Sequence, residues 1–315
     1  MAANVETMAY TKFSERDVPW HGLGVNVDHY MTSEEALIAA GLNWKVQPQP
    51  MFINFNGQMI EIPNVIANVR DSDGSVLGTV TDRYNVCQNS EAFEFTDTLL
   101  GMNVQYDTAG SLNDGKRVWM LAKMPGVTIL DDEYVPYLLF VNNHDGKGSI
   151  KVATVPIRIV CSNTANLALS QADRFWSTRH MGNLSSKMAE AHRTLELANN
   201  YLDNLKIEAD NLYSQKINTK EFEVFMEMLL PVKEEPSERQ IKNITDMRNE
   251  LSFRYFEAPD LADIRNTKWG VMQAVSDFAT HREPQRASDS FKENLFGQII
   301  NGHVLMDKAF ELLTA

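Results

Sequence analysis

The sequence is poor in cysteine and has no long hydrophobic run. Cys87 and Cys161 are the two cysteines in 315 residues, too few for the disulfide framework of a small secreted protein, so we expect two reduced and buried thiols. No apolar stretch approaches the roughly 20 residues that span a bilayer. The N-terminal segment MAANVETMAYTKFSERD has no signal-peptide core, so we expect a cytoplasmic protein without membrane association.

The usual short motifs of metal and phosphate sites are also missing. The seven histidines form no HxH or HExxH pattern, and the two cysteines form no CxxC pair, although metal ligands need such fixed spacing. Neither GxxxxGK[ST] nor GxGxxG occurs, so no dedicated phosphate-binding loop is indicated. We therefore expect no metal and no cofactor, and we regard an enzyme as less expected than a binding protein.

Positive charge is scarce overall but gathered in one segment. The net charge is −13, which argues against a general nucleic-acid coat, because phosphate binding depends on Lys and Arg. From Val141 to Leu195, seven Lys or Arg stand against three acids. This segment carries +4, so the rest of the chain carries −17. A cationic centre in an acidic chain indicates an anionic partner.

The order of the expected elements predicts an α+β fold. Apolar runs between Pro50 and Val160 predict strands, with hairpin turns at Asn56-Gly57 and Asp73-Gly74 and a polar turn at Asp145-Gly146-Lys147-Gly148. Helices are expected after Thr32, with Leu37, Ile38 and Leu42 on the inner face, and over 90–100, capped by Ser90 with Phe93 or Phe95 facing inward. Residues 163–216 and the C-terminal region read as helical, with Ser237 capping one helix. We predict an antiparallel sheet backed by a long helix and followed by C-terminal helices.

This pattern divides the chain into three zones. Residues 1–49 are expected to form an N-terminal arm, 50–216 an α+β core domain, and 217–315 a helical C-terminal region. Within the core domain, apolar residues from Leu184 to Leu212 follow a 4-3 spacing over four heptads. This stripe either packs on its own sheet or contacts a second subunit, and the spacing allows both.

The segment VPIRIVCSNTANLAL, Val155 to Leu169, reads as a buried strand that enters a helix. Ser162, Asn163 and Thr164 can each cap that helix, and the remaining amides can bind a ligand or a neighbouring subunit. Cys161 at the junction is either a small buried side chain or a thiol activated by the helix N-terminus.

Aromatic and basic residues alternate in QADRFWSTRH, residues 171–180. Such a segment either holds single-stranded nucleic acid, with bases stacked on Phe175 or Trp176, or ends a helix with its aromatic rings in the core. The candidate nucleic-acid-binding residues of the whole segment are Lys147, Lys151, Arg158, Asn163, Arg174, Trp176 and Arg179.

Two motifs resemble one known family. VPWHGLG at residues 18–24 and PIRIVCSNT at residues 156–164 resemble the marks of the phage/plasmid-like protein family, catalogued as a domain of unknown function (932). The resemblance covers the chain from about Pro19 to beyond Leu205. It implies a mobile-element origin and action inside a bacterial host, and it assigns no catalytic residue. The order of elements is also similar to that of phage single-strand-annealing recombinases, which is an analogy of fold alone.

Three functions follow as hypotheses. The first is a non-enzymatic homo-oligomer that binds single-stranded DNA, with strand annealing in recombination as its role. The second is a counter-defence protein whose acidic surface binds a basic host protein. The third is an enzyme that uses Cys161 or a pocket near Trp20 and His21, although two glycines and a buried Trp20 also explain that loop as a structural plug.

Overall fold

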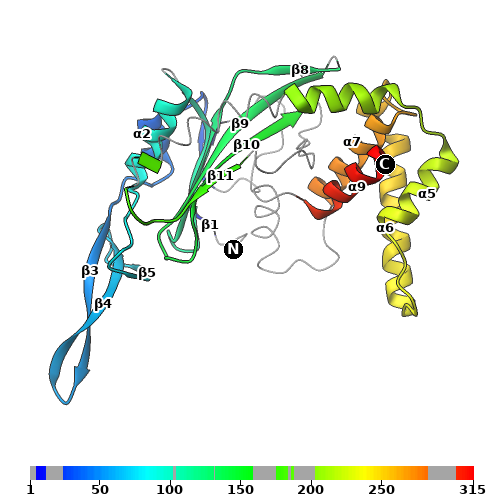
Figure 1. Cartoon of the computed structure of the whole chain (residues 1–315). Coiled ribbons are helices and arrows are strands. Elements are labelled where there is room, and N and C mark those ends of the chain that lie inside the picture. Colours follow the sequence, from blue (N-terminus) through cyan, green and yellow to red (C-terminus); the bar gives the residue numbers. More distant parts are fainter. Residues whose placement is uncertain are drawn as a thin grey trace. The chain divides into compact units, whose positions relative to one another are not determined.

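The computed structural model describes residues 5–11, 24–101, 104–130, 132–158, 175–183, 186–187, 203–282 and 303–315 (Figure 1). The chain forms two compact units. The first takes its residues from 1–124, 137–154 and 174–197, and the second from 125–136, 155–173 and 198–315. Residues 24–49 therefore belong to the same unit as the sheet, whereas the sequence pattern predicts a separate arm over residues 1–49.

Strands dominate the first unit and helices the second. The strands are β1 (Val5–Thr11), β2 (Val25–Val27), β3 (Val46–Phe55), β4 (Gln58–Arg70), β5 (Val76–Thr81), β6 (Gln105–Leu112), β7 (Arg117–Lys123), β8 (Val127–Ile129), β9 (Asp132–Asn143), β10 (Ile150–Arg158) and β11 (Phe175–Thr178). The helices are α1 (Ser33–Ala39), α2 (Asn89–Leu100), α5 (Thr219–Leu229), α6 (Glu238–Glu257), the 3-10 turn η3 (Pro259–Leu261), α7 (Lys268–His281) and α9 (Val304–Thr314). The α+β class and the helical C-terminal region are confirmed.

Eight strands form one large sheet in the order β11-β10-β9-β7-β6-β1-β2, and β8 pairs with β9. The pairs β10–β11, β9–β7, β7–β6 and β6–β1 are antiparallel, while β1 and β2 run parallel. Because side chains alternate along a strand, Val118 and Met120 of β7 share a face with Leu138 and Phe140 of β9 and lie in one core cluster. The predicted antiparallel sheet is thus confirmed.

Two helices cover the core face of this sheet. The predicted cap of α1 is confirmed, since the Thr32 hydroxyl accepts from the Glu35 amide at 3.3 Å. Phe93 and Phe95 of α2 are both buried, as predicted, but Ile38 is 59% exposed, so its predicted inward position is wrong. Helix α2 begins at Asn89, ahead of the predicted cap Ser90.

The start of α2 is fixed by a contact that is distant in sequence. The side chain of Gln88 accepts from the Val46 amide and donates to the Val46 carbonyl, both at 2.9 Å. Its backbone amide also donates to the Glu91 carboxylate at 2.8 Å. These bonds anchor the helix to the beginning of β3. A capping rule considers only neighbouring residues, so it places the start of α2 one residue too late.

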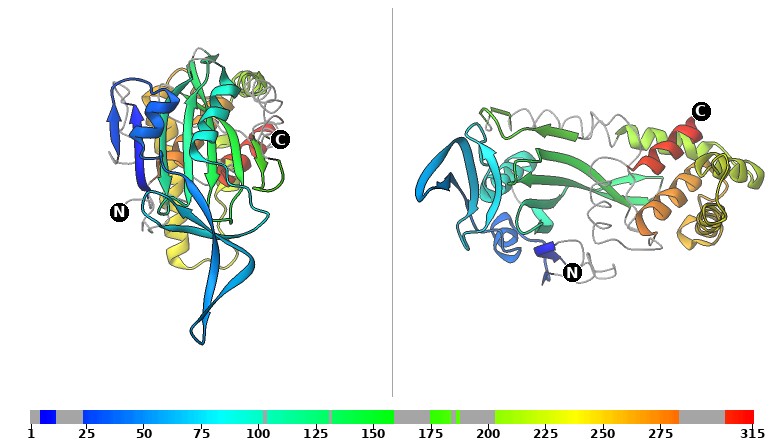
Figure 2. Two further views of the ribbon diagram at one scale, coloured as in Figure 1. Left: turned by 90° about the vertical axis from the view of Figure 1, so that its left-hand side faces the viewer. Right: turned by 90° about the horizontal axis from the view of Figure 1, so that it is seen from below.

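A second sheet has the order β3-β4-β5. Strands β3 and β4 form a long hairpin that extends away from the rest of the first unit in Figure 1 and in the left view of Figure 2. Its turn is the predicted Asn56-Gly57, with φ of 50° and 85°, the positive values that a tight hairpin turn requires. Strand β5 pairs with β4 only from Val65 to Val69. Toward the turn, from the pair of Phe52 and Glu61 to the pair of Phe55 and Gln58, the described part of the sheet consists of β3 and β4 alone.

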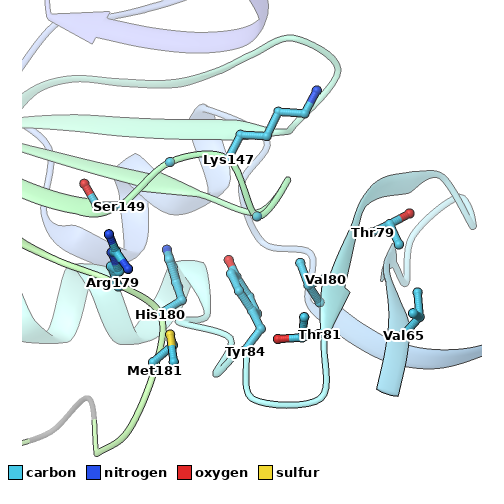
Figure 3. A pocket seen from close by; sticks show the side chains of 12 residues that line it. Val65, Thr79, Val80, Thr81, Tyr84, Lys147, Ser149, Arg179, His180 and Met181 are labelled. Atoms are coloured by element: carbon cyan, nitrogen blue, oxygen red, sulfur yellow. The ribbon is translucent and has the colours of Figure 1, made fainter. Parts of the chain in front are cut away.

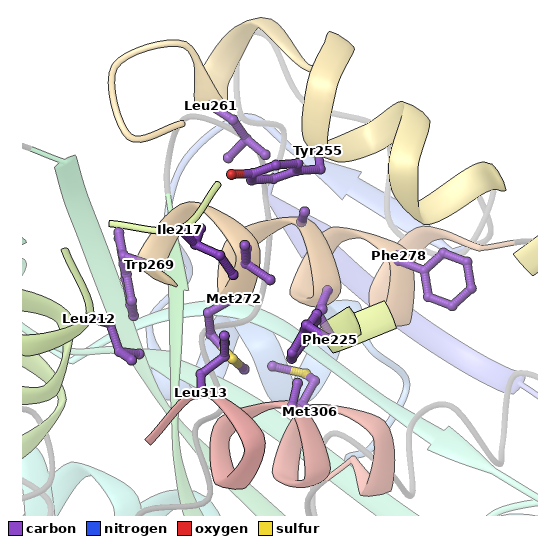
Figure 4. Close-up of a cluster of buried hydrophobic side chains, with 14 of the residues drawn as sticks. Leu212, Ile217, Phe225, Tyr255, Leu261, Trp269, Met272, Phe278, Met306 and Leu313 are labelled. Carbon is purple, nitrogen blue, oxygen red and sulfur yellow. The ribbon is translucent and has the colours of Figure 1, made fainter. Parts of the chain in front are cut away.

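The second unit is a helical cluster with its own apolar core (Figure 4). Ser237 caps α6, as predicted, by accepting from the Gln240 amide at 3.3 Å. The rings of Phe222 and Tyr255 stack with centroids 4.3 Å apart, and both are buried. Trp269 of α7 is fully buried in the same cluster.

Part of the heptad stripe can be placed. Residues 203–214 are helical, and Leu205, Ala209 and Leu212 are fully buried in the core of the second unit. Intramolecular packing is therefore confirmed for this part, although against the C-terminal helices instead of the first unit's sheet. Apart from residues 186–187, the preceding part of the stripe, 184–202, lies outside the described residues.

The sequence pattern missed several strands, among them β1, β6 and β11. Strand β6 lies between β7 and β1 but carries buried polar residues, which break the apolar alternation. The Thr11 hydroxyl donates to the Asp107 carboxylate at 2.5 Å, and the Ser111 hydroxyl donates to that of Glu6 at 3.0 Å. The sequence pattern predicts a helical region over residues 163–216, which is wrong for residues 175–178, because they pair with β10 as the edge strand β11.

Candidate functional site

One pocket of the first unit has a volume of about 690 Å³ (Figure 3). It is lined by Val65, Thr79, Val80, Thr81, Tyr84, Gly146, Lys147, Gly148, Ser149, Arg179, His180 and Met181. Three parts of the chain form it: the β4–β5 ribbon with the turn that follows it, the turn between β9 and β10, and the segment after β11. We call it the cationic pocket, because Lys147 and Arg179 lie on it.

The β9–β10 turn is held by side chains that bond to its backbone. The Asp145 carboxylate accepts from the Lys147 amide at 2.9 Å, the local bond typical of an aspartate turn. The side-chain Nδ2 of the buried Asn143 donates to the Ser149 carbonyl at 2.8 Å. A Cβ on Gly148 would lie 2.3 Å from the Asn143 side chain, so this close approach requires glycine. The turn therefore presents Lys147 from a rigid base.

A second glycine contact joins the turn to strand β5. A Cβ on Gly78 would lie 2.5 Å from the Asp145 Cα, and a Cβ on Gly146 would lie 2.7 Å from the Val80 Cγ1. The two backbones thus approach more closely than any side chain between them would allow. Glycine at these positions lets the three-stranded sheet form one wall of the pocket.

The edge of the large sheet gathers further basic and hydroxyl groups. Lys151 of β10 is paired with Ser177 of β11, so their side chains share one face of the sheet. The Ser149 and Ser177 hydroxyls are 2.8 Å apart and hydrogen-bonded. The pKa of Lys151 is lowered, first by burial and second by the neighbouring charge of Arg117. Lys151 and Arg117 thus place two basic groups near one another at this edge of the sheet.

Lys147 and Arg179 are exposed side chains from separate segments. Within the described part of the chain, neither forms an ion pair. Figure 3 shows Arg179 beside Ser149, while the Lys147 ammonium extends outward from the turn. Two such cations at one pocket can each hold an anionic oxygen.

The half-buried ring of Tyr84 and the buried ring of His180 line the pocket near Arg179. Tyr84 and His180 stack with centroids 4.5 Å apart and an interplanar angle of 15°. The Tyr84 hydroxyl donates to the Asn143 carbonyl at 2.6 Å, and His180 Nδ1 lies 3.1 Å from the Asn85 carbonyl. Since a carbonyl only accepts, Nδ1 carries the proton. Burial lowers the pKa of His180 to about 4, so the ring is neutral near pH 7.

The structure brings together three of the seven candidate residues named from the sequence. Lys147 and Arg179 line the cationic pocket, and Lys151 lies on the adjoining sheet edge. Arg158 ends β10, but its side chain lies outside the described residues, as do Asn163 and Arg174. Trp176 is paired with Val152 and packs against the first core, so the expected stacking of bases on this ring is not supported by its position.

Sequence reasoning missed several residues of the pocket. Tyr84 and His180 are 96 positions apart in the sequence, and no local pattern links them. Thr79 and Thr81 belong to β5, and Ser149 belongs to the β9–β10 turn. None of these segments has a sequence pattern that predicts a ligand site. The one local signal among these residues is the glycine pair of Asp145-Gly146-Lys147-Gly148, which predicts a polar turn.

Other chemistries find less support in the described residues. They contain no group of three or more His, Cys, Asp and Glu able to hold a metal ion, and none of their helices is long and apolar enough to cross a membrane. Cys87 is a free, buried cysteine, as predicted, and burial raises the pKa of its thiol to about 12. Cys161, Trp20 and His21 lie outside the described residues.

Comparison with known proteins identifies one family. The model of the family described as domain of unknown function (DUF932) matches residues 76–296, so the chain belongs to this family. Every residue that lines the cationic pocket, except Val65, falls within the match, as does the RIVCSNT motif, whereas the PWHGLG loop precedes it. No curated protein and no solved structure is significantly similar to the chain.

Proposed function

We propose that this member of the DUF932 family is a non-enzymatic phage or plasmid protein that binds single-stranded nucleic acid at the cationic pocket in the bacterial cytoplasm. The observation that carries the proposal is the position of Lys147 and Arg179, two exposed cations from separate segments, at one pocket. In a chain with a net charge of −13, this placement favours an anionic ligand, because cations that lack a protein partner gain most from phosphate oxygens.

The neighbouring groups suit a strand better than a lone phosphate. Lys151 and the Ser149 and Ser177 hydroxyls continue the polar surface from the pocket along the β10–β11 edge. A single strand tracks such a row with successive phosphates. Tyr84 supplies an aromatic ring inside the pocket, where a base can stack, in place of Trp176. Arg158, Asn163 and Arg174 stay predicted contacts of the same strand.

Strand annealing is the role that we propose for this binding. Annealing needs a protein that holds the sugar-phosphate backbone and leaves base edges accessible for pairing. The cations of the pocket and of the β10–β11 edge provide backbone contacts of this kind. The proposed activity needs neither a nucleophile nor a metal, and it is independent of the sequence of the strand.

Fluorescence anisotropy of a labelled single-stranded oligonucleotide, titrated with the full chain at several salt concentrations, tests the proposal. We expect an affinity that falls steeply with salt, and a weaker affinity for the Lys147→Ala/Arg179→Ala variant. Because each phosphate contact to a single strand contributes about 0.7 to the log–log salt slope, losing both should reduce the slope by roughly 1.4.

The matched control is Lys220→Ala/Lys233→Ala, which removes two exposed cations from the second unit. We expect this variant to bind like the wild type. No binding at low salt, or an equal loss in both double variants, would overturn the proposal. The acidic surface, with a basic host protein as its partner, would then become the leading hypothesis.

A further inference from the structure

The tip of the β3–β4 hairpin is an apolar surface that the fold leaves open. Five large hydrophobic side chains around the turn are between 43% and 65% exposed: Phe52, Ile53, Phe55, Met59 and Ile60. They lie on both faces of a two-stranded ribbon, since Ile53 pairs with Ile60 and Phe52 pairs with Glu61. Such a ribbon is marginal in water without further packing, and fully burying each of these side chains is worth about 1.5–3 kcal/mol.

The hairpin is also the least charged part of the chain. From Val46 to Val69 the only charged residue is Glu61, in a chain with a net charge of −13. Nucleic acid and anionic lipid would require cations, which this stretch lacks, and a basic partner would require more acids. Two copies of an acidic chain repel each other, and this repulsion is weakest where the two contacting surfaces carry little or no charge. The hairpin is such a surface, so a second copy of the chain fits it best.

Prolines leave only one part of the outer β3 edge free for strand pairing. Strand β3 is the terminal strand of its sheet, so its outer backbone groups have no partner in that sheet. Pro48 and Pro50 lack an amide proton, and proline in a sheet places this missing donor at the open edge. The edge that can accept another strand is therefore Met51–Phe55, next to the exposed apolar residues.

From the exposure, neutrality and open edge of this hairpin, we infer that two copies of the chain associate through it. The Met51–Phe55 edges pair antiparallel across a two-fold axis, a self-complementary arrangement in which each edge meets its own copy. The axis lies near Ile53, the middle residue of the open edge. The corresponding edge of β4 is disfavoured, because a two-fold there would bring two copies of Glu61 together. This inference does not depend on the proposed nucleic-acid binding.

Sedimentation velocity of the full chain over a range of concentrations tests the inference. We expect a concentration-dependent dimer for the wild type and a monomer for Ile53→Asp/Phe55→Asp. The control Val76→Asp/Val304→Asp adds the same charge at positions that are 58% and 81% exposed outside the tip, and it should remain dimeric. A wild type that stays monomeric, or a tip variant that dimerises normally, would overturn the inference.

A cysteine cross-link tests the register and does not depend on a disruptive substitution. Directly opposed residues of an antiparallel pair have Cα atoms about 4.5–5.5 Å apart, within the range that a disulfide can bridge. Oxidised Ile53→Cys should therefore give a covalent dimer, while Val76→Cys and the wild type should not. Equal cross-linking of both cysteine variants would contradict the two-fold at the tip. Weaker oligonucleotide binding by the tip variant with an unchanged oligomeric state would instead identify the hairpin as a nucleic-acid wedge.

Discussion

Asn85 and His180 hold each other through backbone and side-chain bonds. The Asn85 amide donates to the His180 carbonyl at 2.8 Å, and His180 Nδ1 donates to the Asn85 carbonyl at 3.1 Å. The pair fastens the segment after β11 to the turn after β5, and it thereby fixes Arg179 at the cationic pocket. A neutral histidine is part of this clamp, so the pocket is coupled to pH.

We expect His180 and His144 to resist protonation down to well below pH 6. Burial lowers the pKa of His180 to about 4, and burial together with the nearby His180 lowers that of His144 to about 3. The exposed His29 has a raised pKa, because it bonds to Asp28 and Glu35. Histidine NMR signals recorded from pH 8 to pH 5 should show His29 titrating while the two buried rings do not. A His180 midpoint near 6.5 would show that the ring is solvated.

These lowered pKa values also predict acid sensitivity of the first unit. The unfolded histidines have a pKa of about 6.5, whereas the folded His180 and His144 have pKa values of about 4 and about 3. Between these pH values the unfolded chain binds protons that the folded chain does not. The free energy of unfolding should therefore be highest above about pH 6.5 and should fall as the pH drops toward 4. Hydrogen exchange of strands β9 and β10 at pH 7 and pH 5 measures this loss. Equal protection at both values, after correction for intrinsic exchange, would contradict the prediction.

Replacing Tyr84 by phenylalanine removes the hydroxyl that donates to the Asn143 carbonyl at 2.6 Å. The ring and its stacking on His180 remain, but a partly buried acceptor loses its donor. We expect Tyr84→Phe to destabilise the first unit by about 1 kcal/mol while the ring proposed to stack on a base is kept. Urea unfolding followed by near-UV circular dichroism measures the change. The substitution Tyr213→Phe, at an exposed ring of the second unit, is the comparison and should leave the stability of the first unit unchanged.

Adding one methyl group at Gly78 should open the pocket wall. The new Cβ would lie 2.5 Å from the Asp145 backbone, so β5 and the β9–β10 turn must move apart. We expect Gly78→Ala to weaken oligonucleotide binding and to raise hydrogen exchange in the turn, whereas Val76→Ala, at an exposed position of the same strand, should change neither. Wild-type binding by Gly78→Ala would show that this wall does not shape the ligand site.

The sequence predicted the parts of the fold that follow local rules. Caps at Thr32 and Ser237 and the turn at Asn56-Gly57 involve neighbouring residues, and all three are confirmed. Strand β6 escaped detection because its buried polar side chains are satisfied by residues distant in the chain, such as Thr11 and Glu6. A hydropathy pattern cannot register bonds of that kind.

The site shows the same division between local and distant information. A count of charges along the chain predicts Lys147, Lys151 and Arg179, because all three lie in the basic stretch 141–195 and their flanking strands β10 and β11 pair at one edge of the sheet. The charge count cannot predict Tyr84 or the role of His180. The two rings come into contact only because Asn85 and His180 are hydrogen-bonded to each other. The mixture of aromatic and basic residues around Trp176 predicts a ligand contact, but strand alternation turns its ring toward the core.

The core of the second unit should tolerate truncation at Phe222 poorly. This ring is fully buried on α5, stacks on Tyr255 at 4.3 Å and meets Phe256 edge-on at 5.5 Å. Phe222→Ala removes these contacts and leaves a cavity, which typically costs about 3–5 kcal/mol. Val224 lies on the same helix but is 55% exposed, so Val224→Ala should change stability by less than about 0.5 kcal/mol.

Hydrogen exchange resolved by peptide distinguishes the two units in this experiment. In Phe222→Ala we expect faster exchange in α5, α6 and α7, with the protection of β6 and β7 retained, because each unit has its own core. Val224→Ala should exchange like the wild type throughout. If β7 lost protection together with α7, the two units would unfold as one cooperative body, and a truncation in the helical core would then also remove the cationic pocket.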